Sequence, residues 1–130
     1  DAVLAGGGEV IGVIPESLKQ DEVAHQGLTS LEVVPSMHQR KARMIELADA
    51  MVALPGGLGT LEEMFEALSW AQLRLHSKPC GLLNVQGYFD SLVSFLDNAV
   101  EHGFMASEHR DLAMVDEDPD HLLSTLLRLP

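Results

Sequence analysis

The chain has 130 residues, of which 46% are hydrophobic, so it can bury one sizeable core, and we expect a single domain over residues 1–130. Its formal net charge of −12 argues against nucleic acid as a partner, because phosphate binding over many nucleotides requires a basic face. No apolar run reaches the ~20 residues of a membrane helix, and the single cysteine, Cys80, cannot form an internal disulfide. These features predict a cytoplasmic protein that binds neither nucleic acid nor membranes.

Short apolar segments alternate with helical patterns along the chain. The first five residues, followed by Gly6, Gly7 and Gly8, look like the end of a helix with a glycine C-cap. Strands are predicted over residues 9–14, 31–34, 50–54, 79–84 and 112–115, and helices over residues 36–49, 60–75, 88–102 and 119–129. This order predicts the α/β class, with a Rossmann-like, doubly wound parallel sheet and helices on both faces.

The helix predicted over residues 36–49 begins with a capping-box pattern, Ser36 followed by Gln39 three residues later. Of the eight Lys and Arg residues, three fall here, at Arg40, Lys41 and Arg43. Positive charge near the start of a helix opposes the helix dipole, and a bound anion would reverse that penalty. The cluster therefore indicates either a local anion site or a solvated face.

Residues 50–63, AMVALPGGLGTLEE, read as a buried strand that enters a glycine-rich turn. Pro55 ends the strand, and Thr60 is expected to start the next helix. Gly56, Gly57 and Gly59 are expected to adopt positive φ and to let the backbone approach a ligand closely. Free N–H groups at the helix start would face an anion, although a tight turn without a ligand gives the same pattern. The turn has no lysine, so it is not a Walker loop, and its spacing is not G-x-G-x-x-G.

The helix predicted over residues 60–75 has two distinguishable faces. An apolar stripe is expected to face the sheet and consists of Leu61, Met64, Phe65, Leu68 and Ala71. A second, mixed face is a candidate contact for another subunit and consists of Glu63, Ala67, Trp70 and Arg74.

Two motifs in this order resemble one family. The pattern P-G-G-x-G-T-x-x-E is matched at residues 55–63, and M-H-x-R-K is matched at residues 37–41. Together they are similar to the "lonely guy" family of cytokinin riboside 5′-monophosphate phosphoribohydrolases, also labelled as lysine decarboxylases. The likeness extends through GGGEVIGVIPESL and GLLNVQGYFDSL. Members of that family begin one βαβ unit earlier, so the resemblance implies that the N-terminal βαβ unit is missing from this chain.

The resemblance implies hydrolysis of the N-glycosidic bond of an (N6-substituted) adenosine 5′-monophosphate in a homodimer, without a metal or cofactor. The reaction passes through an oxocarbenium-like state, so the family's catalytic pair, carried over to Glu63 and Arg40, would stabilise positive charge and hold the sugar phosphate. Ser69 stands where relatives often have threonine. The implied substrate-binding residues are Glu22, Met37, Arg40, Lys41, Gly56, Gly57, Leu58, Gly59, Thr60, Leu61, Glu62, Glu63 and Ser69.

Two other functions fit the sequence poorly, and a third remains open. A pyridoxal phosphate decarboxylase needs a Schiff-base lysine, and Lys19, Lys41 and Lys78 stand in unsuitable contexts. The six histidines show no paired metal-ligand spacing. A nucleotide- or cofactor-binding carrier without catalysis is the alternative that remains, because the glycine turn explains binding and not turnover.

Overall fold

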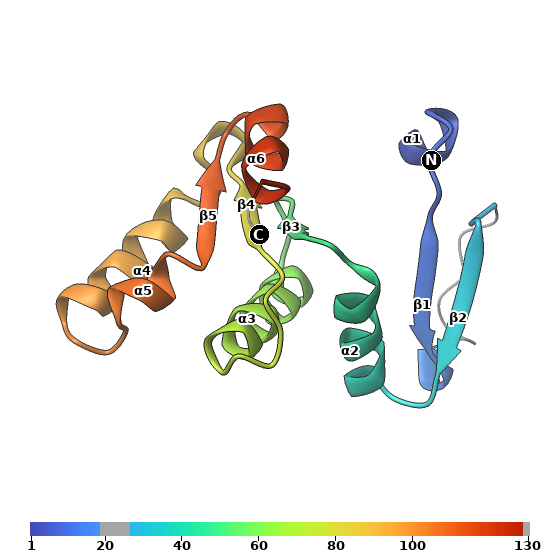
Figure 1. The fold of residues 1–130 in the computed structure, drawn as a ribbon, viewed down its shortest axis with the longest axis horizontal. Helices are drawn as coiled ribbons and strands as arrows, with labels where there is room; N and C mark the ends of the chain where they lie inside the picture. The colour runs from blue at the N-terminus through green and yellow to red at the C-terminus, as the bar shows by residue number, and fades with distance from the viewer. Residues whose placement is uncertain (19–26, 129–130) are drawn as a thin grey trace. The chain divides into compact units, whose positions relative to one another are not determined.

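The computed structural model describes residues 1–18 and 27–128 (Figure 1). The chain divides into two compact units, Asp1–Leu47 and Ala48–Pro130. Each unit contains its own parallel sheet with at least one helix packed against it. The predicted Rossmann-like α/β class is therefore confirmed, and a single domain over residues 1–130 stays a prediction.

The first unit has two parallel strands and one helix packed against both of them. Strands β1 and β2 pair from Ile11 opposite Ser30 to Pro15 opposite Val34. Ile14 and Pro15 of β1 and Ile45 of α2 are buried. The elements of this unit are α1 (Ala2–Ala5), β1 (Ile11–Pro15), the 3-10 turn η1 (Glu16–Leu18), β2 (Ser30–Val34) and α2 (Met37–Leu47).

The end of α1 confirms the predicted glycine C-cap. Gly7 has a φ of 80°, and its N–H donates to the carbonyl of Leu4 at 3.0 Å. The N–H of Gly8 donates to the carbonyl of Val3 at 2.9 Å. These two bonds form a Schellman motif, in which a left-handed residue satisfies the last carbonyls of a helix.

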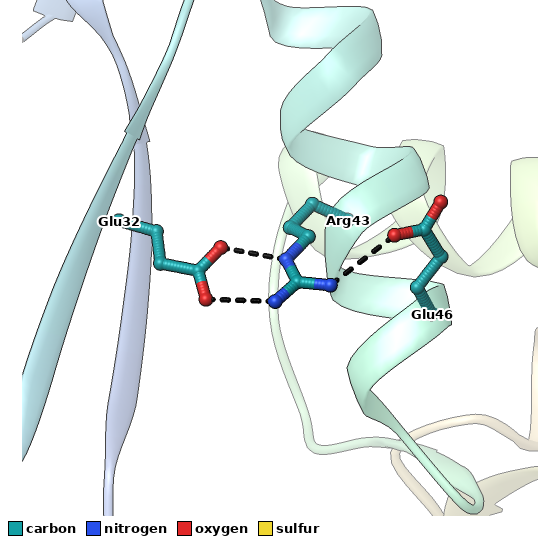
Figure 2. A network of polar contacts seen from close by, with 3 residues as sticks. All are labelled: Glu32, Arg43 and Glu46. Carbon is teal, nitrogen blue, oxygen red and sulfur yellow. Dashed lines mark hydrogen bonds and ion pairs between the residues drawn. The ribbon is translucent and has the colours of Figure 1, made fainter.

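An ion pair joins α2 to β2 in the first unit (Figure 2). The Arg43 guanidinium donates from Nε to Glu32 Oε2 at 2.6 Å and from Nη2 to Glu32 Oε1 at 2.9 Å. Its Nη1 donates to Glu46 Oε2 at 3.3 Å. Two carboxylates of this chain thus bind the Arg43 guanidinium, whose side chain remains 38% exposed.

The second unit contains a three-stranded parallel sheet in the order β3-β4-β5. Met51 lies opposite Cys80, and Cys80 lies opposite Ala113. The elements are β3 (Met51–Ala53), α3 (Leu58–Gln72), β4 (Cys80–Leu83), the 3-10 turn η2 (Val85–Gly87), α4 (Asp90–Glu101), α5 (Ser107–Arg110), β5 (Ala113–Asp116) and α6 (Pro119–Leu126).

Helices cover both faces of this sheet (Figure 1). A Cβ on Gly81 would lie 2.9 Å from Leu122 Cδ1, so this position of β4 faces α6. Side chains alternate along a strand, so Ala113, next to the partner of Gly81, faces the other way. Ala113 lines a small cavity together with Phe65 of α3 and Leu96 of α4. A doubly covered sheet explains why the strands read as continuous apolar runs.

Cys80 is a core residue of β4, with 1% of its surface exposed. Burial raises the pKa of its thiol to about 11, because the thiolate would be poorly solvated there. The thiol is therefore protonated at neutral pH and contributes to packing, as expected for a buried structural cysteine.

Several element boundaries differ from the predicted ones. Helix α3 begins at Leu58 rather than Thr60, and α4 begins at Asp90 rather than Tyr88. The short helix α5 and the 3-10 turns η1 and η2 were not predicted, because segments this short carry too few residues for a periodic pattern.

The predicted mixed face of α3 needs correction at two of its four positions. Ala67 is 2% exposed and belongs to the core, while Arg74 lies beyond the helix end at Gln72. Arg74 has a φ of 59°, and its N–H donates to the carbonyl of Ala71 at 2.9 Å. It occupies the left-handed position of a Schellman motif, where glycine is usual. A continuous helical face from Glu63 to Arg74 therefore does not exist.

The Glu32–Arg43 ion pair predicts how the stability of the protein depends on pH. The Arg43 guanidinium holds the pKa of Glu32 below its usual value of 4.5. This contribution to stability is complete above the unfolded-state pKa and is lost as the pH falls through the lower folded-state pKa. We expect Glu32→Gln to lower the Tm at pH 7 by on the order of 1–3 °C, with the difference disappearing in strong acid.

Thermal unfolding of both proteins between pH 7 and pH 2.5, followed by circular dichroism, tests this expectation. Glu117→Gln is the control, because Glu117 is an exposed carboxylate outside this network. A Tm difference for Glu32→Gln that stays constant over the whole pH range would contradict the assignment.

Candidate functional site

The glycine-rich turn joins the carboxyl end of β3 to the start of α3. Gly57 is the N-cap, with φ −96° and ψ −150°, and no side chain caps the helix. The first helical bond runs from the N–H of Leu61 to the carbonyl of Gly57 at 3.1 Å. The N–H groups of Leu58, Gly59 and Thr60 precede that bond and are not satisfied within the helix. N–H groups in this arrangement can bind an anion, and the anion site stays a prediction.

The glycines of the turn act differently from the prediction. None of Gly56, Gly57 and Gly59 has a positive φ, so left-handed backbone is not the reason for them. A Cβ on Gly56 would lie 2.2 Å from Thr60 Oγ1 and 2.9 Å from Thr60 Cβ, so only glycine fits below this threonine. At Gly57 and Gly59 a Cβ would meet nothing within 4 Å. These two glycines leave open space over the helix start, which a ligand can use to approach the amides.

Glu63 lies in the second turn of α3, because the helix begins at Leu58, two residues before the predicted start at Thr60. The helix dipole falls off within the first turn, so it acts only weakly on this carboxylate. Glu63 is partly buried, whereas Glu62 and Leu58 are exposed. The helix therefore presents the open amides at its start and the Glu63 carboxylate one turn further along.

Asn84 and Tyr88 also lie near this turn. Neither of them is among the site residues predicted from the sequence. Because β3, β4 and β5 are parallel, the segments after their carboxyl ends meet at one edge of the sheet. Asn84 follows β4, and its N–H donates to the carbonyl of Asp116 of β5 at 2.8 Å. The Tyr88 hydroxyl donates to the carbonyl of Gly56 at 2.7 Å. In the sequence, the only sign of a turn at this place is the glycine that directly precedes Tyr88, in N-V-Q-G-Y.

The other predicted residues of the M-H-x-R-K segment lie at the start of α2, in the first unit. Ser36 Oγ accepts from the N–H of Gln39 at 3.2 Å, which confirms the predicted capping bond. Arg40 Nη1 lies 3.6 Å from Met37 Sδ, so these two side chains are in contact. Met37, Arg40 and Lys41 therefore share the first turns of one capped helix.

Two further predicted substrate contacts are Ser69 and Glu22. Ser69 is on α3, six residues after Glu63, which corresponds to about 9 Å along the helix axis. It lines the small cavity of the second unit together with Gln72, His109 and Arg110. Glu22 lies outside the described residues.

Two kinds of feature are absent from the described ranges, residues 1–18 and 27–128. In these ranges no helix is both long and apolar enough to span a lipid bilayer. Over the same residues, no three His, Cys, Asp or Glu side chains gather in a way that could hold a metal ion.

The parallel strands and the open helix start after β3 define an α/β protein of the Rossmann-like class with a candidate anion site. A family model described as "Possible lysine decarboxylase" matches residues 1–126. The chain belongs to this family, the "lonely guy" family that the two motifs indicated.

Relatives of this chain carry consistent names. It is 51% identical over 126 residues to "Probable cytokinin riboside 5'-monophosphate phosphoribohydrolase LOGL9" of Oryza sativa subsp. japonica, covering 97% of this chain and 56% of that protein. It is 48% identical to "Cytokinin riboside 5'-monophosphate phosphoribohydrolase LOG1" of Arabidopsis thaliana, covering 96% and 59%. It is 49% identical to "Cytokinin riboside 5'-monophosphate phosphoribohydrolase" of Rhodococcoides fascians, covering 97% and 64%. The chain thus spans less than two thirds of the length of these relatives.

The contact between Gly56 and Thr60 predicts unequal tolerance to alanine within the turn. Gly56→Ala forces the new methyl against a β-branched side chain, and we expect it to destabilise the protein by about 1–3 kcal/mol. Gly57→Ala meets open space with a φ of −96° and is expected to cost less than about 0.5 kcal/mol. Urea unfolding of the two variants measures the difference, and equal losses of stability would contradict it.

Proposed function

We propose that this protein hydrolyses the N-glycosidic bond of an adenosine 5′-monophosphate, with or without an N6 substituent, to the free base and ribose 5-phosphate. One observation carries the proposal: the segment from Pro55 to Glu63 forms an uncapped helix start with open space at Gly57 and Gly59. It is supported by close to 50% identity with relatives named cytokinin riboside 5'-monophosphate phosphoribohydrolase.

The 5′-phosphate is the part of the substrate that this turn fits. A phosphate accepts hydrogen bonds from several N–H groups at once, and those of Leu58, Gly59 and Thr60 point from a helix start. The missing side chains at Gly57 and Gly59 let a tetrahedral anion come within hydrogen-bond distance. Binding energy from the phosphate, which does not react, then fixes the ribose for the chemical step.

Cleavage breaks the bond between ribose C1′ and the base nitrogen, and water adds its oxygen to C1′. The base leaves with a proton, so the products are a neutral base and ribose 5-phosphate. Positive charge develops on C1′ and the ring oxygen, which the Glu63 carboxylate stabilises while it orients the attacking water. Arg40 binds ribose or phosphate oxygens through its planar guanidinium and holds the sugar for this attack.

The remaining residues complete the proposed site. Lys41 adds a second cation for the phosphate, and Met37, which contacts Arg40, lies against the base. Glu22 and Ser69 are proposed as further substrate contacts, together with the turn residues Leu61 and Glu62. None of these steps requires a metal or an organic cofactor, and we propose that the protein acts in the cytoplasm.

A carrier that binds the nucleotide without cleaving it is the second candidate. The open helix start supports binding in both cases. A carrier has no need for a carboxylate one turn beyond the backbone N–H groups that are proposed to bind the phosphate. The presence of Glu63 there favours the hydrolase.

We further propose that the functional unit is a homodimer. Trp70, one of the two mixed-face residues that remain on α3, is only partly buried in the single chain. Large aromatic side chains are enriched at the centres of interfaces, and a twofold axis lets such a surface meet its own copy.

Glu63 and Arg40 are expected to act mainly on the transition state. We expect Glu63→Gln and Arg40→Ala each to lower kcat/KM for the nucleotide by on the order of 10²-fold or more. Release of free base from AMP and N6-isopentenyl-AMP by the full-length protein measures this. Arg43→Ala is the control, because its guanidinium binds Glu32 and Glu46 and its loss should affect stability rather than turnover. Full activity in a folded Glu63→Gln protein would refute the assignment, and nucleotide binding without turnover in the unaltered protein would favour the carrier.

The turn also predicts a strong preference for a phosphorylated substrate. We expect kcat/KM for the nucleoside to be lower than that for its 5′-monophosphate by about 10²-fold or more, because the amides and cations lose their anion. Parallel assays on adenosine and AMP give the ratio. Equal turnover of the two would show that the turn binds some other group.

The dimer proposal is tested by a charge at Trp70. We expect Trp70→Glu to weaken association and to reduce activity, because the new carboxylate would be buried without a partner. Light scattering at micromolar concentration reports the mass, and circular dichroism confirms that the variant is folded. Ser94→Glu, an exposed position of α4, is the control. A fully active monomer would contradict the proposal.

A further inference from the structure

We propose that Tyr88 is a positioning residue for the phosphate-binding turn. Its hydroxyl donates to the carbonyl of Gly56 at 2.7 Å, across 32 residues of sequence. That carbonyl belongs to the residue just before the N-cap Gly57. A hydrogen bond at this point fixes the peptide plane between Gly56 and Gly57, and with it the direction of the first N–H groups of α3. This inference rests on the proposed function of the turn.

The loop that carries Tyr88 is hydrogen-bonded to Asn84, a buried polar residue with 5% of its surface exposed. Asn84 Nδ2 donates to Asp90 Oδ1 at 2.8 Å, and Asn84 Oδ1 accepts from the N–H of Phe89 at 2.7 Å. Its backbone N–H donates to Asp116 of β5. One side chain at the end of β4 therefore binds the two residues that directly follow Tyr88, at the start of α4.

The backbone of this loop is unusual. Gln86, a non-glycine residue, has a φ of 52°, and Gly87 has a φ of 71°. Left-handed backbone at a non-glycine residue costs free energy and persists only where the surroundings hold it. A Cβ on Gly87 would also lie 2.5 Å from Asp90 Oδ2. This double left-handed bend turns the chain abruptly before Tyr88.

The surroundings of the Tyr88 ring point to positioning rather than core packing. The residue is 55% exposed, whereas its neighbour Phe89 is 2% exposed and fills the core. The two rings meet edge to face with centroids 5.0 Å apart, so Phe89 supports the orientation of Tyr88. An exposed tyrosine whose hydroxyl reaches a backbone carbonyl of the turn holds that turn while it leaves the space over Gly57 and Gly59 open.

Tyr88→Phe removes the hydroxyl and keeps the ring, so it tests the hydrogen bond alone. We expect KM for AMP to rise about three- to tenfold, with kcat changed by less than about twofold, because a misdirected phosphate site weakens substrate binding. The much lower activity on adenosine should not change, since that substrate does not use the phosphate amides. A purely structural tyrosine would instead lower stability and affect both substrates equally.

Ser124→Ala is the matched control. Ser124 Oγ donates to the carbonyl of His121 at 2.9 Å, so this variant also deletes one hydroxyl-to-carbonyl bond in the same unit, away from the turn. We expect it to leave the AMP-to-adenosine ratio unchanged. An unchanged ratio in Tyr88→Phe, or an equal loss of activity on both substrates, would overturn the proposal.

A second measurement separates failure of this inference from failure of the proposed activity. Amide NMR of the full-length protein, titrated with inorganic phosphate, follows the N–H signals of Gly57, Leu58 and Gly59 without any reaction. We expect Tyr88→Phe to shift these signals in the free protein and to weaken phosphate binding about three- to tenfold. If the unaltered protein binds phosphate at these amides and hydrolyses no nucleotide, the hydrolase proposal fails. The phosphate titration of Tyr88→Phe still tests the positioning role of Tyr88 in that case. If Tyr88→Phe leaves these amide signals and the phosphate affinity unchanged, Tyr88 does not position the turn.

Discussion

The parallel pairing of β3, β4 and β5 is the constraint on which the candidate site depends. Parallel strands place all of their carboxyl ends at one edge, so three connections that are distant in sequence emerge side by side. The glycine turn follows β3, the Asn84 loop follows β4, and Asp116 ends β5. With antiparallel pairing, Tyr88 would not lie within hydrogen-bond distance of Gly56.

The central strand β4 makes this arrangement stable. Cys80 and Leu82 are each 1% exposed, and Gly81 between them has no room for a side chain beside Leu122. Burial on both faces stabilises the sheet through the apolar surface removed from water. The edge of the sheet can then carry less favourable backbone, such as the left-handed Gln86, because the core beneath it is tightly packed.

Charge is distributed so that local sites can differ from the strongly acidic average of the chain. Arg43 is neutralised by two carboxylates and orients α2 against β2 (Figure 2). Arg40 and Lys41 stand three and two residues earlier on the same helix, toward its N-terminal end. Three neighbouring cations thus have different roles: Arg43 holds α2 against β2, and Arg40 and Lys41 are proposed to bind an anion.

The alternation of strands and helices, the family and the location of the glycine turn could all be inferred from the amino-acid sequence. Apolar runs and capping residues are local signals, so the strands from β1 to β5 and the cap at Ser36 could be predicted. The reason for a glycine at position 56 is the position of Thr60, which is seen only in the folded chain. The burial of Ala67 in the core is likewise seen only there. That Tyr88 lies in a loop and reaches Gly56 is also seen only in the folded chain, since a contact across 32 residues depends on strand pairing. Such contacts have no periodic signature in the chain, because they are set by the packing of segments that are distant in sequence.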